Sequence, residues 1–344
     1  MSKALRIGFI GAGTNTRERH LPGFAEIEGV ELAAVCNRSE ASGRAVAEAF
    51  GIAQVETDWL KVARNPDIDA VCIGTWPNLH AEATIACLEM GKHVLCEARM
   101  ARNLAEAQTM LAVAEAQPEL VVQIVPSPFT LGVDGAIREL LDSGKLGELR
   151  EVRVVQTLPG ATDPTAPLSW RLDHELSGMN TLMLGIFHEA VQRWIGEEPE
   201  WVSANAEIFT RQRPDPQTGE LREVQIPDVL TVLGRWPSGA RLNYHMSGIE
   251  TEPSQEIRLN GSKAGLRVLA SENKLIFTPN GGQPREIAPE NSPGWQVERE
   301  FVDAIREGRP VERTHPRQGV AYMEFTERVW RSWNQQGARI GRLI

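Results

Sequence analysis

Short apolar runs alternate with segments of helical character over the first 125 residues, and this alternation constrains the fold more than any other feature. The apolar runs lie at 5–10, 31–36, 70–74, 93–96 and 120–124, and the main helical segments at 41–50, 78–90 and 103–116. Strands that alternate with helices form a doubly wound parallel sheet. We therefore predict an α/β fold with a ligand site at the carboxyl ends of the strands, where Gly11, Asn37, Thr75 and Glu97 lie.

The pattern changes after residue 126. A helical segment at 133–143 precedes apolar runs with hairpin spacing at 150–157, 201–210, 229–236, 240–247, 256–260, 265–269 and 274–278. Residues 211–228 contain three prolines and many polar residues, which predicts an exposed loop. A chain of 344 residues exceeds the usual size of a single core. We expect two domains, 1–125 and 126–344, the second an α/β domain with a mainly antiparallel sheet.

The charge and the cysteine pattern exclude several classes of protein. The net charge is −10 and no dense run of Lys or Arg occurs, which argues against nucleic acid or an anionic membrane as the main partner. No apolar stretch is long enough to span a bilayer and the start of the chain has no signal-peptide pattern, so we expect a soluble, cytoplasmic protein. Four cysteines without C-x-x-C spacing and histidines without metal-ligand spacing predict reduced thiols and no metal site.

The turn after the first apolar run has the spacing of a dinucleotide-binding loop. Gly11 allows the tight turn, Gly13 lets a pyrophosphate approach the backbone, and the amides that open the next helix face the phosphate charge. The third glycine of the usual fingerprint is Thr16 here. We predict that the pyrophosphate is held by Gly11, Gly13, Thr14, Asn15 and Thr16.

The end of the second run meets the adenosine ribose in such a fold. An acidic residue there would bind the 2′-hydroxyl of NAD, but this chain has Asn37-Arg38-Ser39. Arginine suits a 2′-phosphate, so the sequence favours NADP, with NAD possible. The alternative is that Arg38 only begins a solvated helix and that Asn37 is a turn residue.

Polar residues follow the third and fourth runs and form the expected nicotinamide half of the site. We assign to it Thr75, Trp76, Pro77, Asn78, His80, Glu97, Ala98 and Gln123. Pro77 suits the first turn of a helix, and the Glu97 carboxylate would accept hydrogen bonds from ribose hydroxyls. The alternatives are that His80 is structural and that Glu97 forms a surface pair with Arg99.

The ordered series of segments resembles the glucose–fructose oxidoreductase, inositol dehydrogenase and rhizopine-catabolism (Gfo/Idh/MocA) family over the whole chain. The matching segments are 10–13 with 20–22, 35–38, 75–80, 91–97, 143–148, 170–173, 259–265 and 301–308. The resemblance implies an N-terminal Rossmann domain, a C-terminal α/β domain with an open sheet, and NAD(P)-dependent redox chemistry on a sugar, cyclitol, polyol or keto-sugar. An exposed sheet face of this kind predicts a homodimer or homotetramer.

The chain departs from the family at three positions that usually handle protons. The lysine of the family's Glu-Lys-Pro segment is Ala98, and the aspartate and histidine of its later segment are Met183 and Phe187. Oxidation of an alcohol releases a proton, so another group must take this role. The replacements that we predict are His188 or His174 for proton transfer, Arg99 for holding an oxyanion or carboxylate, and Asn180, which shares the helical face of the missing pair.

Two other functions stay open at this point. The chain could use transient oxidation to eliminate or hydrolyse a glycosidic bond without net redox change, as some family members do. It could also bind the cofactor without catalysing a reaction, since the three usual positions are Ala98, Met183 and Phe187.

Overall fold

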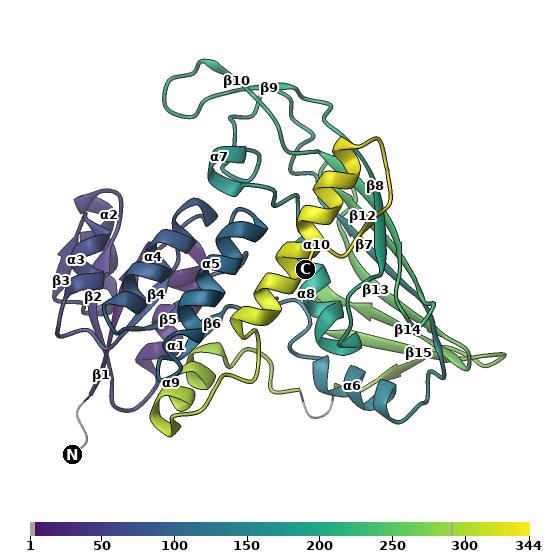
Figure 1. The fold of residues 1–344 in the computed structure, drawn as a ribbon, viewed down its shortest axis with the longest axis horizontal. Helices are drawn as coiled ribbons and strands as arrows, with labels where there is room; N and C mark the ends of the chain where they lie inside the picture. The colour runs from purple at the N-terminus through teal and green to yellow at the C-terminus, as the bar shows by residue number, and fades with distance from the viewer. Residues whose placement is uncertain (1–3, 290–291) are drawn as a thin grey trace. The chain divides into compact units, whose positions relative to one another are not determined.

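The computed structural model describes residues 4–289 and 292–344, and the chain divides into two compact units (Figure 1). Unit 1 comprises Met1–Pro126 and Gln296–Val320, and unit 2 comprises Ser127–Trp295 and Ala321–Ile344. The last segment of unit 1 lies far along the sequence from the rest of it. The division at residue 125 that we expected therefore needs a correction for residues 296–320.

Unit 1 is built on a parallel sheet of six strands in the order β3-β2-β1-β4-β5-β6. The strands are β1 (Leu5–Ile10), β2 (Val30–Cys36), β3 (Gln54–Glu56), β4 (Ala70–Ile73), β5 (His93–Cys96) and β6 (Val122–Ile124). The connecting helices are α1 (Leu21–Ala25), α2 (Glu40–Phe50), α3 (Trp59–Arg64), α4 (Pro77–Glu89) and α5 (Leu104–Glu115). The predicted doubly wound sheet is confirmed. The sequence analysis gave no ranges for the short elements α1, β3 and α3.

The strand order places the reversal of winding between β1 and β4. Ile10 pairs with Cys36 of β2 on one side and with Ile73 of β4 on the other. The residues that follow these three strands, Gly11, Asn37 and Gly74, therefore meet at one edge of the sheet. This edge is the switch point at which doubly wound sheets bind ligands.

Residues 296–320 join unit 1 through α9 (Val297–Glu307) and the segment after it. The Phe301 ring of α9 packs edge-on against Phe24 of α1, with ring centroids 6.3 Å apart. Further along, the amide of Ile124 in β6 donates to the Thr314 carbonyl at 3.0 Å. These contacts between residues distant in the sequence carry no local signal, which is why the sequence analysis assigned 296–320 to the second domain.

Unit 2 contains a sheet of nine strands in the order β16-β15-β14-β13-β7-β12-β11-β8-β17. The strands are β7 (Leu149–Thr157), β8 (Trp201–Glu207), β11 (Val229–Arg235), β12 (Arg241–Ser247), β13 (Ser254–Gly261), β14 (Ala264–Leu269), β15 (Lys274–Pro279), β16 (Arg285–Ile287) and β17 (Ile340–Gly341). Within this sheet, as far as the structure describes it, β7 and β12 form the only parallel pair and all other neighbours are antiparallel. The prediction of a mainly antiparallel sheet is confirmed.

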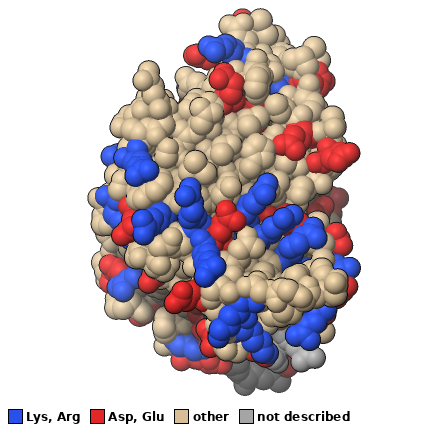
Figure 2. All heavy atoms as spheres, turned by 90° about the vertical axis from the view of Figure 1, so that its right-hand side faces the viewer, with Lys and Arg blue, Asp and Glu red and all other residues tan. Residues whose placement is uncertain are grey.

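Helices cover one face of this sheet. Apolar side chains of α6 (Asp134–Asp142), α8 (Leu184–Ile195) and the later part of α10 (Pro316–Asn334) share one core with the inward side chains of the strands. The strands show the alternation of a half-covered sheet, as in β8 and β11, where every second residue is buried. The side chains between them form the outer face, which Figure 2 shows with interspersed acidic and basic groups.

The segment 211–228 is not the exposed loop that we expected. It holds a two-stranded hairpin of β9 (Gln212–Pro214) and β10 (Leu221–Glu223), and Val224 and Ile226 share a small core with Leu168 and Leu172. Arg213 is buried and donates to the carbonyls of residues 161, 163 and 166. Prolines and charged residues are typical of exposed loops, so the composition of 211–228 gives no sign of this hairpin. The hairpin depends instead on hydrogen bonds from the Arg213 guanidinium to carbonyls about 50 residues earlier in the chain.

All four cysteines, Cys36, Cys72, Cys87 and Cys96, are buried as free thiols, as the sequence predicts. Burial raises the pKa of the Cys36 thiol to about 11 and that of Cys87 to about 12. Within the described residues, no helix combines the length and the apolar character that crossing a membrane requires.

Candidate functional site

The loop after β1 has the shape that a pyrophosphate requires. Gly11 has a φ of +84°, and a β-carbon there would lie 2.6 Å from Thr75 Cγ2 and 2.9 Å from the Gly74 carbonyl carbon. Gly13 is exposed, and a β-carbon there would find its nearest neighbour, the Gly74 oxygen, only at 3.8 Å. The inner side of the loop is thus tightly packed and its outer side is open, which fits the approach of a phosphate group to the backbone.

Thr16 occupies the position of the missing third glycine, and Gly74 compensates for it. The Thr16 hydroxyl donates to the Gly11 carbonyl at 3.2 Å. A β-carbon on Gly74, at the end of β4, would overlap both this hydroxyl and the Gly11 oxygen. The close approach of helix and strand is therefore kept, with the glycine on the strand instead of the helix. Thr14, the neighbouring predicted ligand, is exposed on the loop.

The residues after β2 lie beside the glycine loop. Asn37 Oδ1 accepts a hydrogen bond from the Ala12 amide at 2.7 Å, so this side chain fixes the loop itself. The guanidinium of Arg38 stacks over the Trp76 ring, 4.3 Å from its centroid. Ser39 caps α2 by accepting from the Ser42 amide. Exposed Arg38 and half-buried Trp76 thus form a cation–π pair on the side where the adenosine is expected.

The predicted residues after β4 are held by a buried histidine. His80 in α4 has Nε2 3.1 Å from the Thr75 carbonyl and Nδ1 2.9 Å from the Arg99 carbonyl. Burial lowers the pKa of His80 and outweighs the opposing effect of these carbonyls. Pro77 occupies the first turn of α4, and Asn78 beside it is exposed. His80 therefore connects the β4 loop to the β5 loop, where the Ala98–Arg99 peptide is cis.

Gln123 and Arg99 are buried in unit 1. Gln123 in β6 donates from Nε2 to the Arg313 carbonyl at 3.3 Å. The Arg99 carbonyl is bound by His80. These contacts explain how both residues are fixed, and the ligand roles that we expected for them stay predictions.

Glu97, directly after β5, is the centre of a buried polar network in unit 1. Its carboxylate accepts hydrogen bonds from the Asn15 side-chain amide and, at 3.1 Å, from the Ala98 backbone amide. It also meets His20 Nε2 at 2.9 Å. His20 Nδ1 lies 2.6 Å from the carboxylate of Glu298 in α9. The carboxylate at the end of β5 is thus tied to the pyrophosphate loop through Asn15.

The charges of this network are fixed by their mutual contacts. Burial lowers the pKa of His20, but the hydrogen bonds and charges of Glu298 and Glu97 outweigh it and raise that pKa to about 9. Burial of Glu97 favours its neutral form, yet His20 and Asn15 together hold the pKa of that carboxyl below its usual value. At neutral pH an imidazolium therefore lies between two carboxylates.

The structure places the predicted catalytic residues of unit 2 in different surroundings. His188 in α8 is fully buried, with Nε2 3.1 Å from Glu198, Nδ1 3.3 Å from the Tyr244 hydroxyl and its ring stacked on Phe325. Both nitrogens are engaged inside the unit, which favours a structural role for His188.

His174 and Asn180 lie near one another in the sequence but differ in exposure. His174, the first residue of α7 (His174–Ser177), is half-buried, and its ring lies 5.4 Å from the Trp330 ring. Asn180 is buried and donates to the Ser177 carbonyl at 2.6 Å. Phe187, which we predict to occupy the position of the family's histidine, is buried and stacks on Phe129 at 5.5 Å. This position cannot transfer protons.

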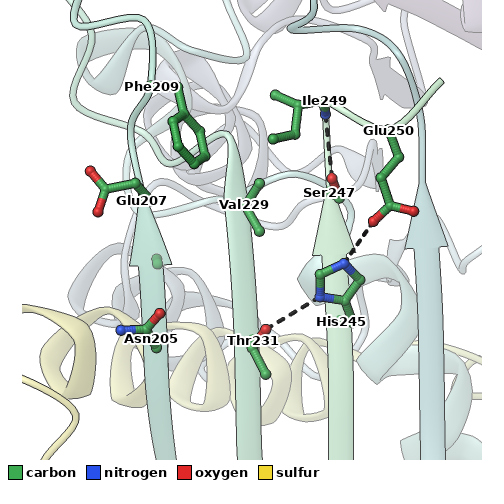
Figure 3. A pocket seen from close by; sticks show the side chains of 10 residues that line it. Asn205, Glu207, Phe209, Val229, Thr231, His245, Ser247, Ile249 and Glu250 are labelled. Carbon is green, nitrogen blue, oxygen red and sulfur yellow. Dashed lines mark hydrogen bonds and ion pairs between the residues drawn. The ribbon is translucent and has the colours of Figure 1, made fainter.

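A separate hollow of about 360 Å³ lies on the outer face of the unit 2 sheet, where β8 and β12 end and β11 begins (Figure 3). His245 points between Thr231, whose hydroxyl is 3.3 Å from Nδ1, and Glu250, whose carboxylate is 2.8 Å from Nε2. Phe209 at the rim is 63% exposed. Aromatic side chains are enriched in protein–protein interfaces relative to the rest of the surface.

Comparison with known proteins agrees with this geometry. A model described as an oxidoreductase family with an NAD-binding Rossmann fold matches residues 5–124, and a model of the GFO/IDH/MocA C-terminal domain matches residues 135–267. The chain belongs to the Gfo/Idh/MocA family. It is an oxidoreductase by this membership, and its first unit is the family's nicotinamide-dinucleotide domain.

Individual Gfo/Idh/MocA relatives resemble the chain over nearly its whole length. It is 26% identical to D-glucoside 3-dehydrogenase of Escherichia coli K12 over 358 aligned residues, and this alignment covers 98% of the chain and 98% of that protein. It is 27% identical over 325 residues to trans-1,2-dihydrobenzene-1,2-diol dehydrogenase of Bos taurus, covering 92% of the chain and 88% of that protein. The crystal structure of an oxidoreductase domain protein from Kribbella flavida matches with a TM-score of 0.90 at 26% identity, over 99% of this chain and 100% of that one.

The sequence reading missed His20 and Glu298 as members of the site. His20 lies in the segment 20–22, which matches the family, so its position was visible although its contact with Glu97 was not. Glu298 is 278 residues away from His20. No local pattern marks it as a site residue.

Proposed function

We propose that this protein is an NAD(P)-dependent dehydrogenase of a sugar, cyclitol or related polyol, or a reductase of the corresponding keto-sugar. The observation that carries the proposal is the ionised Glu97 carboxylate, linked by Asn15 to an open glycine loop at the switch point of the sheet. Two Gfo/Idh/MocA relatives with matching length are named as dehydrogenases of a glucoside and of a dihydrodiol, and both names denote carbons that carry hydroxyl groups.

The roles of the residues follow from their chemistry. The cofactor, when bound, accepts or delivers the hydride. The glycine loop would hold its pyrophosphate, and Glu97 would accept hydrogen bonds from the ribose on the nicotinamide side. Arg99, permanently charged, would hold an oxyanion or carboxylate, and Asn180 would hydrogen-bond the substrate. We assign proton transfer to His174 because it is half-buried, whereas His188 has both nitrogens engaged.

Turnover with a panel of sugars, cyclitols and polyols tests this function. We expect a substrate-dependent change of absorbance at 340 nm with NAD or NADP, and a loss of about 100-fold or more in kcat for His174→Asn because a general acid–base group is removed. His245→Asn, on the outer face of unit 2, is the matched control and should retain activity. Cofactor binding without any absorbance change across the panel would contradict the proposal.

A second function is favoured by the apolar positions Ala98, Met183 and Phe187, the last of which is stacked in the core of unit 2. The protein would then eliminate or hydrolyse a glycosidic bond through transient oxidation, or bind cofactor without reaction. Mass spectrometry of the products separates these cases, because loss of an aglycone with an unchanged cofactor indicates the non-redox reaction.

Arg38 supports NADP as the preferred cofactor, since a guanidinium forms charge-assisted hydrogen bonds with a 2′-phosphate. Arg38→Ala should raise the Kd for NADPH by about tenfold or more and change the Kd for NADH by less than about twofold. The control is Arg44→Ala, which removes an exposed arginine paired with Glu40 on α2. Equal effects of Arg38→Ala on both cofactors, measured by fluorescence titration, would contradict the preference.

The outer face of the unit 2 sheet supports a homodimer or homotetramer. It presents both charges, as in the pairs of Glu256 with Arg258 and Arg267, and it contains the hollow beside the exposed Phe209. A surface with both charges can complement a second copy of itself. We expect sedimentation of the full chain to show an oligomer and Phe209→Asp to shift it towards the monomer. A wild-type monomer at micromolar concentration would contradict this.

A further inference from the structure

His20 is enclosed by two acidic side chains that come from different parts of unit 1. It is the last residue of a π-helical turn, Thr16–His20, between the glycine loop and α1. Its side chain has no exposed surface, and its two nitrogens face Glu97 after β5 and Glu298 in α9. π-helical turns occur frequently at functional sites.

The fold makes room for the second carboxylate. Glu298 is only 3% exposed, and a β-carbon on Gly23 in α1 would lie 2.7 Å from Glu298 Oε2. A buried carboxylate is costly unless a charged or hydrogen-bonding partner compensates it. His20 is such a partner. Glu298 therefore lies close to α1 at a glycine and reaches the far side of the same imidazole that Glu97 contacts.

Two donating nitrogens are needed to hold both carboxylates. A neutral imidazole has only one N–H, whereas the imidazolium has two. The Glu298 contact stabilises the charged ring and so keeps the second N–H for Glu97. The titratable groups that act on this network are Glu97 from the end of β5, Glu298 from α9, His80 from α4 and Cys72 from β4.

We propose that His20, held in its charged form by Glu298, is a positioning residue that fixes the Glu97 carboxylate for the nicotinamide half of the cofactor. The inference rests on the proposed function only in placing Glu97 beside the nicotinamide ribose. Glu298, from a segment more than 275 residues along the chain, acts through His20 and does not itself contact the cofactor.

The test measures binding of NADH and NADPH to the full chain, and of their adenine halves, ADP and 2′-phospho-ADP, by calorimetry. Glu298→Gln and His20→Asn should each raise the Kd of the tighter dinucleotide by about tenfold, the effect of one charge-assisted hydrogen bond. The Kd of the matching adenine half should change by less than about twofold. Glu300→Gln, two residues along α9, removes the half-buried pair with Arg313 and should change neither value.

The pH profile separates positioning from a general loss of structure. In the wild type, dinucleotide affinity should be constant from pH 6 to about 8 and fall as His20 loses its proton near pH 9. In Glu298→Gln this fall should move to lower pH, because one stabilising charge is gone. An unchanged pH profile, or equal losses for the dinucleotide and its adenine half, would overturn the proposal.

A double-mutant cycle completes the test. If His20 acts through Glu97, then Glu97→Gln combined with Glu298→Gln binds the dinucleotide no more weakly than Glu97→Gln alone. Additive losses would overturn the proposal. Thermal unfolding of each variant without cofactor reports whether it is folded. Because no substrate is present, failure of this inference is distinguishable from the absence of sugar turnover, which would contradict the proposed dehydrogenase.

Discussion

Gly11→Ala is expected to reduce binding of NADH and NADPH below detection and to lower the free energy of unfolding by roughly 2–5 kcal/mol. Two effects add at this position. The φ of +84° is unfavourable for any residue with a β-carbon, and that carbon would lie 2.6 Å from Thr75 and 2.9 Å from the backbone of residues 74 and 75. Backbone atoms at the end of β4 cannot move aside without disturbing the sheet. The loop must shift instead, and the phosphate site shifts with it.

Gly51→Ala is the control for backbone strain alone. Gly51 ends α2 with a φ of +69°, but a β-carbon there would meet no atom within 4 Å. We expect it to cost about 1–2 kcal/mol and to leave cofactor affinity unchanged. Calorimetric titration and thermal unfolding measure both quantities. A Gly11→Ala protein that binds cofactor within threefold of the wild type would contradict the assignment of the loop.

Arg193→Leu is expected to lower the free energy of unfolding of unit 2 by about 3–5 kcal/mol, because it leaves buried acids without their partner. Arg193 Nη1 bonds both Glu189 oxygens at 2.9 and 3.0 Å, and Nη2 lies 3.1 Å from Asp134 and 2.8 Å from the Thr130 hydroxyl. Glu189 in turn accepts from the Ser127 amide at 2.8 Å. Arg193 therefore joins α8 to the first residue of α6 and, together with Glu189, to the segment 127–130 that precedes α6.

The loss should depend on pH. Burial raises the pKa of Glu189 even with Arg193 present, and removal of that positive charge raises it further. An acid with a raised pKa destabilises the fold when it is ionised, so the loss should be smaller at pH 5 than at pH 8. Arg211→Leu, which breaks the exposed pair with Glu207 at the end of β8, should cost at most about 1 kcal/mol. Equal losses from the two variants in denaturant titrations would contradict this reading of Arg193.

The parts of the fold that the sequence predicts are those with a strong local period. β1 and β5 begin and end where the apolar runs do, and the hairpin strands of unit 2 differ from the predicted ranges mainly at their ends. The hairpin within 211–228 was missed because a guanidinium and a small core stabilise it, and neither has a periodic signature. The placement of 296–320 in unit 1 was missed for the same reason, since contacts such as Phe24 with Phe301 are long-range.

The candidate site likewise contains residues that the local sequence predicts and residues that depend on long-range contacts. The glycine loop, Asn37 and Glu97 follow strands directly, and topology alone brings them to one edge. The sequence analysis did not identify His20 as a site residue, because its role depends on Glu298, which lies 278 residues away in the sequence. The predicted role of His188 depended on its orientation, which a helical wheel gives only approximately, and the structure shows its ring stacked on Phe325. The roles of His174, Arg99 and Asn180 stay predictions.

The interrupted course of unit 1 along the chain also sets the order in which the protein can be completed during synthesis. Between Pro126 and Gln296, all residues up to Trp295 belong to unit 2, about 170 residues, which a ribosome makes in roughly 10–30 s. Throughout this interval the six-stranded sheet exists without α9, so Phe24 lacks Phe301 and His20 lacks Glu298. The nucleotide-binding half begins before unit 2 and is completed only after residue 295, and its buried imidazole acquires its second carboxylate only once Glu298 has been made.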